Sequence, residues 1–210
     1  MTEPWPATPT PPRPFDPEIL TIDEGAQFYR VHPITFGSTL FNPGAGHGGR
    51  FHFFGTPKVP VLYMADTRVA AVAETLLHDL PVGKRSRLRR SDYETMVLSK
   101  IEVRRPLRVA VFHGMGLRRL GVQANQLTDT PTSRYPLTLL WAQAAHRAGL
   151  DGTVWMSRQC NSDQSYVLFG NRVSRDDLHD VPDDRMAFGT SEGRDWLVQT
   201  CSPLQIDIAP

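Results

Sequence analysis

The sequence has only two cysteines, Cys160 and Cys201, among its 210 residues. Neither belongs to a Cys-x-x-Cys pair, and the seven histidines lack the spacing of a ligand set, so we expect no structural metal. Two isolated thiols in a chain of this length favour free cysteines in a reducing compartment. A single disulfide between them is the alternative.

Long apolar runs are also missing. No stretch approaches the roughly 20 apolar residues that a membrane-spanning helix needs. The N-terminus has no basic region followed by an apolar one, as a secretory signal would. We therefore expect a cytoplasmic protein with no membrane partner.

Neither sign of charge is in excess, because 23 Lys and Arg face 22 Asp and Glu, for a net charge of +1. Nucleic-acid-binding domains usually carry a clear basic excess. The one basic run, Lys84–Arg90, has no interleaved aromatic residues, which favours a solvated loop. No nucleic-acid partner is expected. The hydrophobic content of 40% suffices for one sizeable core.

Proline, by contrast, is concentrated at the N-terminus, with seven prolines in residues 1–18. Such a segment lacks many backbone donors, so we interpret it as a flexible tail. A polyproline ligand for a partner protein is the alternative. Residues 19–210 are expected to form one domain.

Hydrophobic patterning predicts more strands than helices. The predicted strands cover 27–31, 59–64, 95–103, 107–112, 153–156, 166–169 and, near the end, 204–208. Helices are predicted over 67–78 and 136–148. Because strands and helices do not alternate regularly, an α+β fold with mixed or antiparallel sheets is favoured over a doubly wound sheet.

Glu74 is the first candidate for chemistry, within the predicted helix 67–78. Its neighbours at helical spacing, Ala70 and Ala71, are small and leave room beside a carboxylate. This pattern suits a catalytic residue, but a solvent-facing Glu74 paired with a nearby cation is an equally simple interpretation.

Two arginines are candidates for anion binding. Arg50 ends a glycine-rich segment, Gly44–Gly49, whose backbone N–H groups can approach a phosphate, with Arg50 as a bidentate fork. Arg30 closes a predicted strand that is partly buried, so its guanidinium needs a counter-charge from protein or ligand. An ordinary flexible loop and a structural ion pair are the alternatives.

The order of these segments along the chain resembles the RES domain, a family named for its Arg, Glu and Ser. The resemblance covers about residues 26–170. Its matching segments are Phe28–Val31, Gly48–Phe51, Val61–Ala65, Ala71–Leu76, Gly152–Arg158 and Tyr166–Phe169. Two positions depart from the family pattern: Ser162–Ser165 replaces Gly-Gly or Asn, and Phe51-His52 replaces Trp-Asn. Both departures concern ligand preference more than activity.

The resemblance implies a fold like that of the ADP-ribosyltransferases around an NAD⁺ cleft. It implies a bacterial toxin that cleaves the nicotinamide–ribose bond of NAD⁺, as a glycohydrolase with water or a phosphorylase with inorganic phosphate. NAD⁺ is then a substrate and no prosthetic group is needed. An Xre-type antitoxin is the implied partner. Two other classes stay open, a transferase that passes ADP-ribose to a macromolecule and a non-catalytic nucleotide-binding module.

The resemblance also assigns residues. The implied catalytic residues are Glu74, Arg30 and Ser157, and the implied NAD⁺-binding residues are Arg30, Arg50, Tyr63, Gly49, Tyr29 and Ser157. Arginine forks suit the pyrophosphate. Tyr63 would stack on the nicotinamide or bond the ribose, and Ser157 would hold the carboxamide or a ribose hydroxyl.

Overall fold

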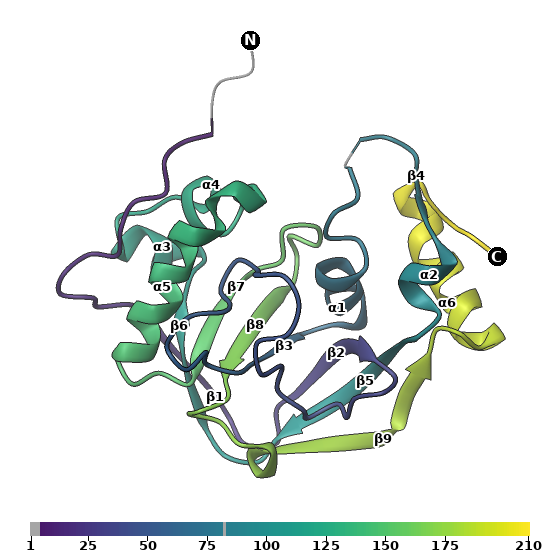
Figure 1. Ribbon diagram of the computed structural model, residues 1–210, viewed down its shortest axis with the longest axis horizontal. Helices are drawn as coiled ribbons and strands as arrows, with labels where there is room; N and C mark the ends of the chain where they lie inside the picture. Colours follow the sequence, from purple (N-terminus) through teal and green to yellow (C-terminus); the bar gives the residue numbers. More distant parts are fainter. Residues whose placement is uncertain (1–4, 82) are drawn as a thin grey trace.

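A computed structural model describes residues 5–81 and 83–210. Its main sheet has eight strands in the order β1-β6-β7-β8-β3-β2-β5-β9 (Figure 1). All neighbours in it are antiparallel except β6 and β7. These strands are β1 (Ile19–Ile22), β2 (Gln27–Pro33), β3 (Val61–Ala65), β5 (Met96–Val103), β6 (Leu107–Val111), β7 (Gly152–Met156), β8 (Gln164–Phe169) and β9 (Leu178–Ala187). A separate parallel pair joins β4 (Ser86–Leu88) to β10 (Ile206–Ile208).

The main sheet curls around an apolar cluster to which every one of its strands contributes. Ile22 on edge strand β1 and Leu178 on edge strand β9 belong to the same buried cluster as Leu62 and Leu168 from the middle of the sheet. A flat sheet would hold its two edges apart, so this shared cluster requires strong curvature. The result is a mixed α+β domain, as the sequence predicted.

Helices cover the other face in two groups, on either side of the central strands (Figure 1). One group, α3 (Gly114–Arg119), α4 (Ala124–Leu127) and α5 (Tyr135–Arg147), forms the crossover that the parallel strands β6 and β7 require. The other group is α1 (Arg68–Thr75), α2 (Arg90–Tyr93) and α6 (Ser191–Cys201). Short 3₁₀ turns occupy Thr132–Arg134, Arg175–Asp177 and Ser202–Leu204.

Strand β3 and helix α1 form locally much as predicted. Both faces of β3 are covered, with Val61 against the α5 group and Leu62 in the curled interior, which explains its unbroken apolar run. The Thr67 side chain caps α1 by accepting from the Ala70 amide at 3.1 Å. Helix α1 ends at Thr75, so the predicted helix 67–78 is about one turn too long.

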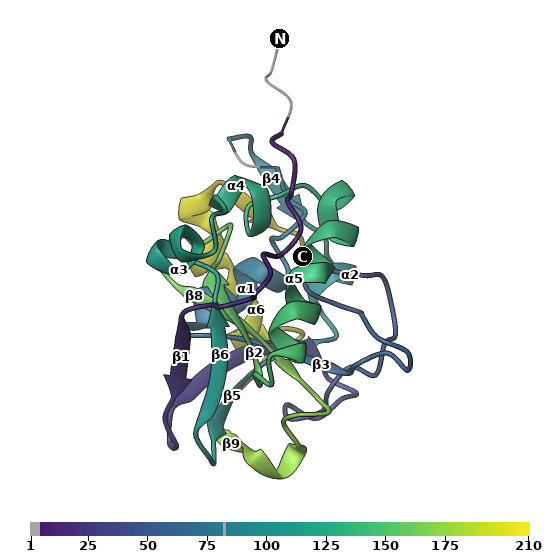
Figure 2. The ribbon, with the colours of Figure 1, turned by 90° about the vertical axis from the view of Figure 1, so that its left-hand side faces the viewer.

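The proline-rich segment was expected to be a flexible tail, but in the structure its described residues pack on the α3–α5 group (Figure 2). Trp141 Nε1 donates to the Pro9 carbonyl at 2.9 Å, and Gln126 Nε2 donates to the Ala7 carbonyl at 3.2 Å. Phe15 packs edge-on against the Trp141 ring. Proline removes backbone donors but keeps the carbonyl acceptors, so side-chain donors can anchor such a segment. Residues 1–4 lie outside the described part.

Three segments differ from the sequence prediction: the basic run 84–90, strand β9 and helix α6. The predicted solvated loop 84–90 contains strand β4, paired with β10 and tied by Arg85 to Asp207 at 2.8 Å. Strand β9 and helix α6 were not predicted at all. Strand β9 is an edge strand whose polar residues are exposed or half-buried, and it contains a proline, Pro182, so it lacks a regular apolar alternation.

Both cysteines are free thiols, and Cys201, the last residue of α6, is buried. Across residues 5–81 and 83–210, no helix combines the length and apolar character that crossing a membrane requires.

Candidate active site

A cleft of about 530 Å³ opens where β2 and β3 separate, between the C-terminal end of α1 and the N-terminal end of α5. The two strands pair only at Tyr29 and Ala65, so they diverge beyond that point. The cleft collects residues from distant parts of the chain. Its polar lining residues are Arg30, Asn42, His47, Arg50, His52, Tyr63, Glu74, Thr75, His78, Asp79, Thr132 and Tyr135.

Glu74, on the last turn of α1, has its carboxylate fixed by two donors. Ser157 Oγ donates to Glu74 Oε1 at 2.7 Å, and the backbone N–H of Arg158 donates to the same oxygen at 2.9 Å. Both donors come from the segment that follows β7. Because they share Oε1, the second oxygen, Oε2, is left for a ligand in the cleft.

Ser157 lies behind Glu74 and does not line the cleft. Its side chain is fully buried, and its hydroxyl also accepts from the Cys160 amide at 3.2 Å. The structure thus unites Ser157 with Glu74, as the resemblance implied. It gives the serine the geometry of a residue that orients the carboxylate, rather than of one that touches a ligand directly.

Arg50 is buried beside the cleft, with 5% of its surface exposed. Its Nη1 donates to Thr130 Oγ1 at 2.8 Å and to the Thr130 carbonyl at 3.2 Å, and the guanidinium lies 5.2 Å from the centre of the Tyr135 ring. Burial lowers the pKa of Arg50, and Glu74 offsets part of that effect. In the described part of the chain Arg50 forms no ion pair.

Arg30 enters the cleft from the point where β2 leaves β3. Its Nη1 donates to two carbonyls, those of Ser38 at 2.6 Å and Leu40 at 2.9 Å. Burial lowers the pKa of Arg30 to about 10. Like Arg50, it has no carboxylate partner among the described residues. A cation that is largely removed from water and has no counter-ion is costly, so the buried Arg50 and the half-buried Arg30 both favour an anionic ligand.

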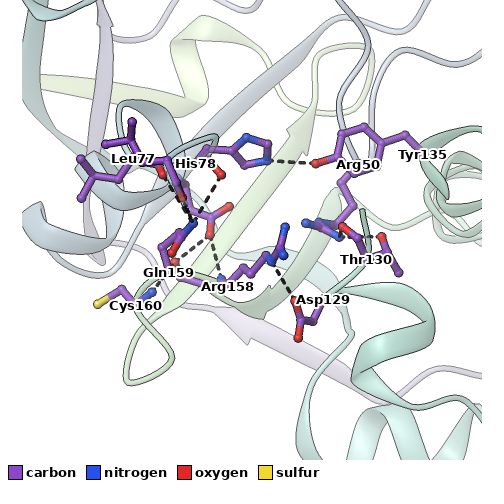
Figure 3. A network of polar contacts seen from close by, with 12 residues as sticks. Arg50, Leu77, His78, Asp129, Thr130, Tyr135, Arg158, Gln159 and Cys160 are labelled. Carbon is purple, nitrogen blue, oxygen red and sulfur yellow. Dashed lines mark hydrogen bonds and ion pairs between the residues drawn. The ribbon is translucent and has the colours of Figure 1, made fainter. Parts of the chain in front are cut away.

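Two residues that the sequence did not single out, Asp129 and Thr130, position Arg158 and Arg50 at the site. Asp129 Oδ1 lies 2.8 Å from Arg158 Nε, next to the amide that binds Glu74, while the adjacent Thr130 anchors Arg50 (Figure 3). Both follow the short helix α4, in a region where the resemblance has no matching segment. Only the folded chain shows that this connection reaches both the carboxylate and the guanidinium.

A further contact crosses the rim of the cleft. His78 Nε2 and the Tyr135 hydroxyl are hydrogen-bonded at 2.9 Å (Figure 3). His78 Nδ1 lies 2.8 Å from Asp79 Oδ1. This contact links the end of α1 to the start of α5. Neither His78 nor Tyr135 carries a sequence signal beyond an ordinary helix end.

The remaining candidates divide between the cleft and its surroundings. Gly49 lines the cleft, and a Cβ atom there would lie 2.2 Å from His52 Cε1, so the position excludes a side chain unless His52 moves. Tyr29 does not line it: its ring lies 5.6 Å beneath the cationic groups of Arg68 and Lys100, which both pair with Asp184. The NAD⁺-binding role implied for Tyr29 therefore has no direct geometric support.

Tyr63 reaches the cleft from β3 and is hydrogen-bonded to His52 Nδ1 at 2.7 Å. Burial raises the pKa of Tyr63 and lowers the pKa of His52 to about 4. Both rings are therefore neutral at pH 7. This neutral pair lines the cleft together with the cationic arginines.

The depressed pKa of His52 makes an acid-stability prediction. His52 takes up a proton near pH 6.5 in the unfolded chain but only near pH 4 in the folded chain. The contribution of neutral His52 to the free energy of unfolding is therefore complete above pH 6.5 and is lost as the pH falls towards 4. The loss is at most about 3 kcal/mol. Urea unfolding gives the free energy of unfolding at pH 7 and at pH 4.5. The difference between these two free energies should be smaller for His52→Gln than for the unchanged protein. The exposed His179→Gln serves as control, and equal differences in all three proteins would contradict this role of His52.

Comparison with known proteins agrees with the resemblance seen in the sequence. The RES domain family model matches residues 27–191, a longer span than the 26–170 expected. In the crystal structure of the M. tuberculosis MbcT–MbcA toxin–antitoxin complex, one chain has a similar fold, with a TM-score of 0.57 and 17% sequence identity. The match covers 79% of this chain and 85% of that chain. A search of the curated proteins finds no match to the sequence.

The family model covers well over half of the sequence, and the resemblance to the RES domain is thereby confirmed. The segments that it spans include Arg30, Arg50, Tyr63, Glu74 and Ser157, all of which the fold brings to or directly behind one cleft. The chain belongs to the RES domain family.

Proposed function

We propose that this protein is a RES-type toxin that cleaves the nicotinamide–ribose bond of NAD⁺. One observation carries the proposal: a carboxylate fixed by two donors shares a cleft with two guanidinium groups that have no carboxylate partner in the described chain. NAD⁺ presents the complementary groups, an anionic pyrophosphate and a ribose that becomes positive as nicotinamide leaves.

Glu74 has the role that the reaction requires of a carboxylate. As the bond from C1′ to the nicotinamide nitrogen breaks, its electron pair leaves with nicotinamide and positive charge develops on the ribose. A carboxylate held beside that charge stabilises the transition state more than the ground state. The donors on Oε1 keep the group in place, so Oε2 can face the ribose without reorganisation.

The second half of the reaction adds an acceptor to C1′. Water attacks with loss of its proton, which Glu74 can accept, to give ADP-ribose; inorganic phosphate gives ADP-ribose 1-phosphate with no proton to remove from a dianion. Arg30 and Arg50 bind the pyrophosphate as forks, which orients the dinucleotide for either acceptor. The resemblance implies the fold of the ADP-ribosyltransferases, and enzymes with that fold use the same substrate.

A partner protein is part of the proposal. The similar chain in the solved structure is a component of a toxin–antitoxin complex. We extend this arrangement to the present chain and expect an antitoxin, of the Xre type by the family resemblance, to neutralise it in trans.

Expression in bacteria without an antitoxin tests this function in the cell. We expect growth to stop while the cellular NAD⁺ content falls, and we expect neither effect from Glu74→Gln expressed to the same level. The measurement follows culture density and extracted NAD⁺ together. Equal arrest by both proteins, with NAD⁺ unchanged, would exclude NAD⁺ loss as the cause.

A further inference from the structure

A second hollow adjoins the cleft and shares part of its wall. Its volume is about 370 Å³, and five of its lining residues also line the cleft. The shared residues are Gly48, Gly49, His52, Thr132 and Tyr135. The two spaces are therefore neighbours that share the glycine-rich segment and the start of α5, and neither Glu74, Arg30 nor Arg50 lines the hollow.

The two spaces differ in chemistry. The cleft holds Glu74 and the arginines, whereas the hollow is bounded by the apolar side chains of Phe53, Pro136 and Leu139. Lys58 also lines it, with Nζ 5.5 Å from the centre of the Phe53 ring and 3.2 Å from the Gly44 carbonyl. Aromatic and aliphatic walls beside one exposed cation suit a purine nucleoside rather than a phosphate.

Tyr135 lies at the junction of the two spaces. It lines both, and its ring lies 5.2 Å from the Arg50 guanidinium. In a dinucleotide the pyrophosphate likewise lies between the two nucleosides. With the reacting ribose beside Glu74 and the pyrophosphate near Arg50, the rest of the molecule points towards the hollow.

We propose that the hollow bounded by Phe53, Lys58, Pro136 and Leu139 binds the adenosine half of the dinucleotide. This inference rests on the proposed function, because it assumes NAD⁺ in the cleft. It goes further by making the site selective for a dinucleotide over nicotinamide mononucleotide, which has the reacting half and a phosphate but no adenosine.

Ligand binding to a variant that does not cleave NAD⁺ tests the inference. In Glu74→Gln protein, calorimetry should show NAD⁺ binding at least about tenfold more tightly than nicotinamide mononucleotide, since a stacked base contributes roughly that much. Leu139→Glu places a carboxylate in the hollow and should lower the ratio of the two affinities, NAD⁺ over nicotinamide mononucleotide, most of the way to one. Leu137→Glu, on the same helix at a partly buried position outside the hollow, is the matched control and should preserve it.

Lys58→Glu provides a second variant at an exposed position, where folding is little affected, and should also lower the ratio. A ratio near one in the Glu74→Gln background would overturn the inference, as would a ratio unchanged by both Leu139→Glu and Lys58→Glu. The proposed function has a separate test, because cleavage is measured on the unmutated chain. Selective binding without cleavage would contradict the function but leave the adenosine site standing.

Discussion

Glu74→Gln should lower the rate of NAD⁺ cleavage by about 10²- to 10³-fold, the effect of removing one preorganised electrostatic contact to a transition state. The amide oxygen can still accept from Ser157 Oγ and from the Arg158 backbone, so the local structure should be kept. What is lost is the negative charge opposite the developing positive charge of the ribose. Initial rates of nicotinamide release provide the measurement.

Glu102→Gln is the matched control for this substitution. Glu102 lies on β5 outside the cleft, where its carboxylate accepts from Gln27 Nε2 at 3.0 Å on the surface. The Glu102→Gln variant should retain the full rate of NAD⁺ cleavage. Thermal unfolding of both variants checks that the fold is intact. Near-normal turnover by a well-folded Glu74→Gln protein would remove Glu74 from the mechanism.

Arg50→Lys should weaken NAD⁺ binding by about 10- to 100-fold, the range expected for losing hydrogen bonds to a charged group. Lysine keeps the charge but cannot hold Thr130 and present a planar fork to a pyrophosphate at the same time. Arg30→Lys should act in the same direction, because its guanidinium is also positioned by two carbonyls. The effect should fall mainly on KM.

Arg119→Lys is the control for these two variants, since Arg119 pairs with Asp16 outside the cleft. Its KM for NAD⁺ should be unchanged. If Arg30→Lys and Arg50→Lys both bind NAD⁺ as tightly as the unmutated chain, the pyrophosphate must lie elsewhere.

The sequence predicted the parts of the site that are local or follow the family pattern. Glu74 could be placed on a helix directly after a buried strand, because apolar periodicity and a Thr67 cap define both elements. The family pattern then linked Glu74 to Ser157, 83 positions away, and the structure brings them to 2.7 Å. Patterning alone left Glu74 open to a solvent-facing interpretation.

The parts that were missed depend on contacts between distant segments. Asp129 and Thr130 matter because the chain after α4 passes between Arg158 and Arg50, and no local pattern encodes that path. Tyr29 and Arg30 are adjacent in sequence, yet only Arg30 reaches the cleft. Adjacent residues of a strand point to opposite faces of the sheet. Which face meets the cleft depends on where β2 and β3 separate, and that is known only from the folded sheet.

Product analysis of NAD⁺ incubated with the purified protein tests the proposed reaction most directly. Nicotinamide should be released mole for mole with NAD⁺ lost, alongside ADP-ribose in phosphate-free buffer or ADP-ribose 1-phosphate when inorganic phosphate is the acceptor. Chromatography with mass detection, with and without phosphate, identifies both products. NAD⁺ that stays intact, or ADP-ribose recovered on a macromolecule instead of in solution, would contradict the proposed function.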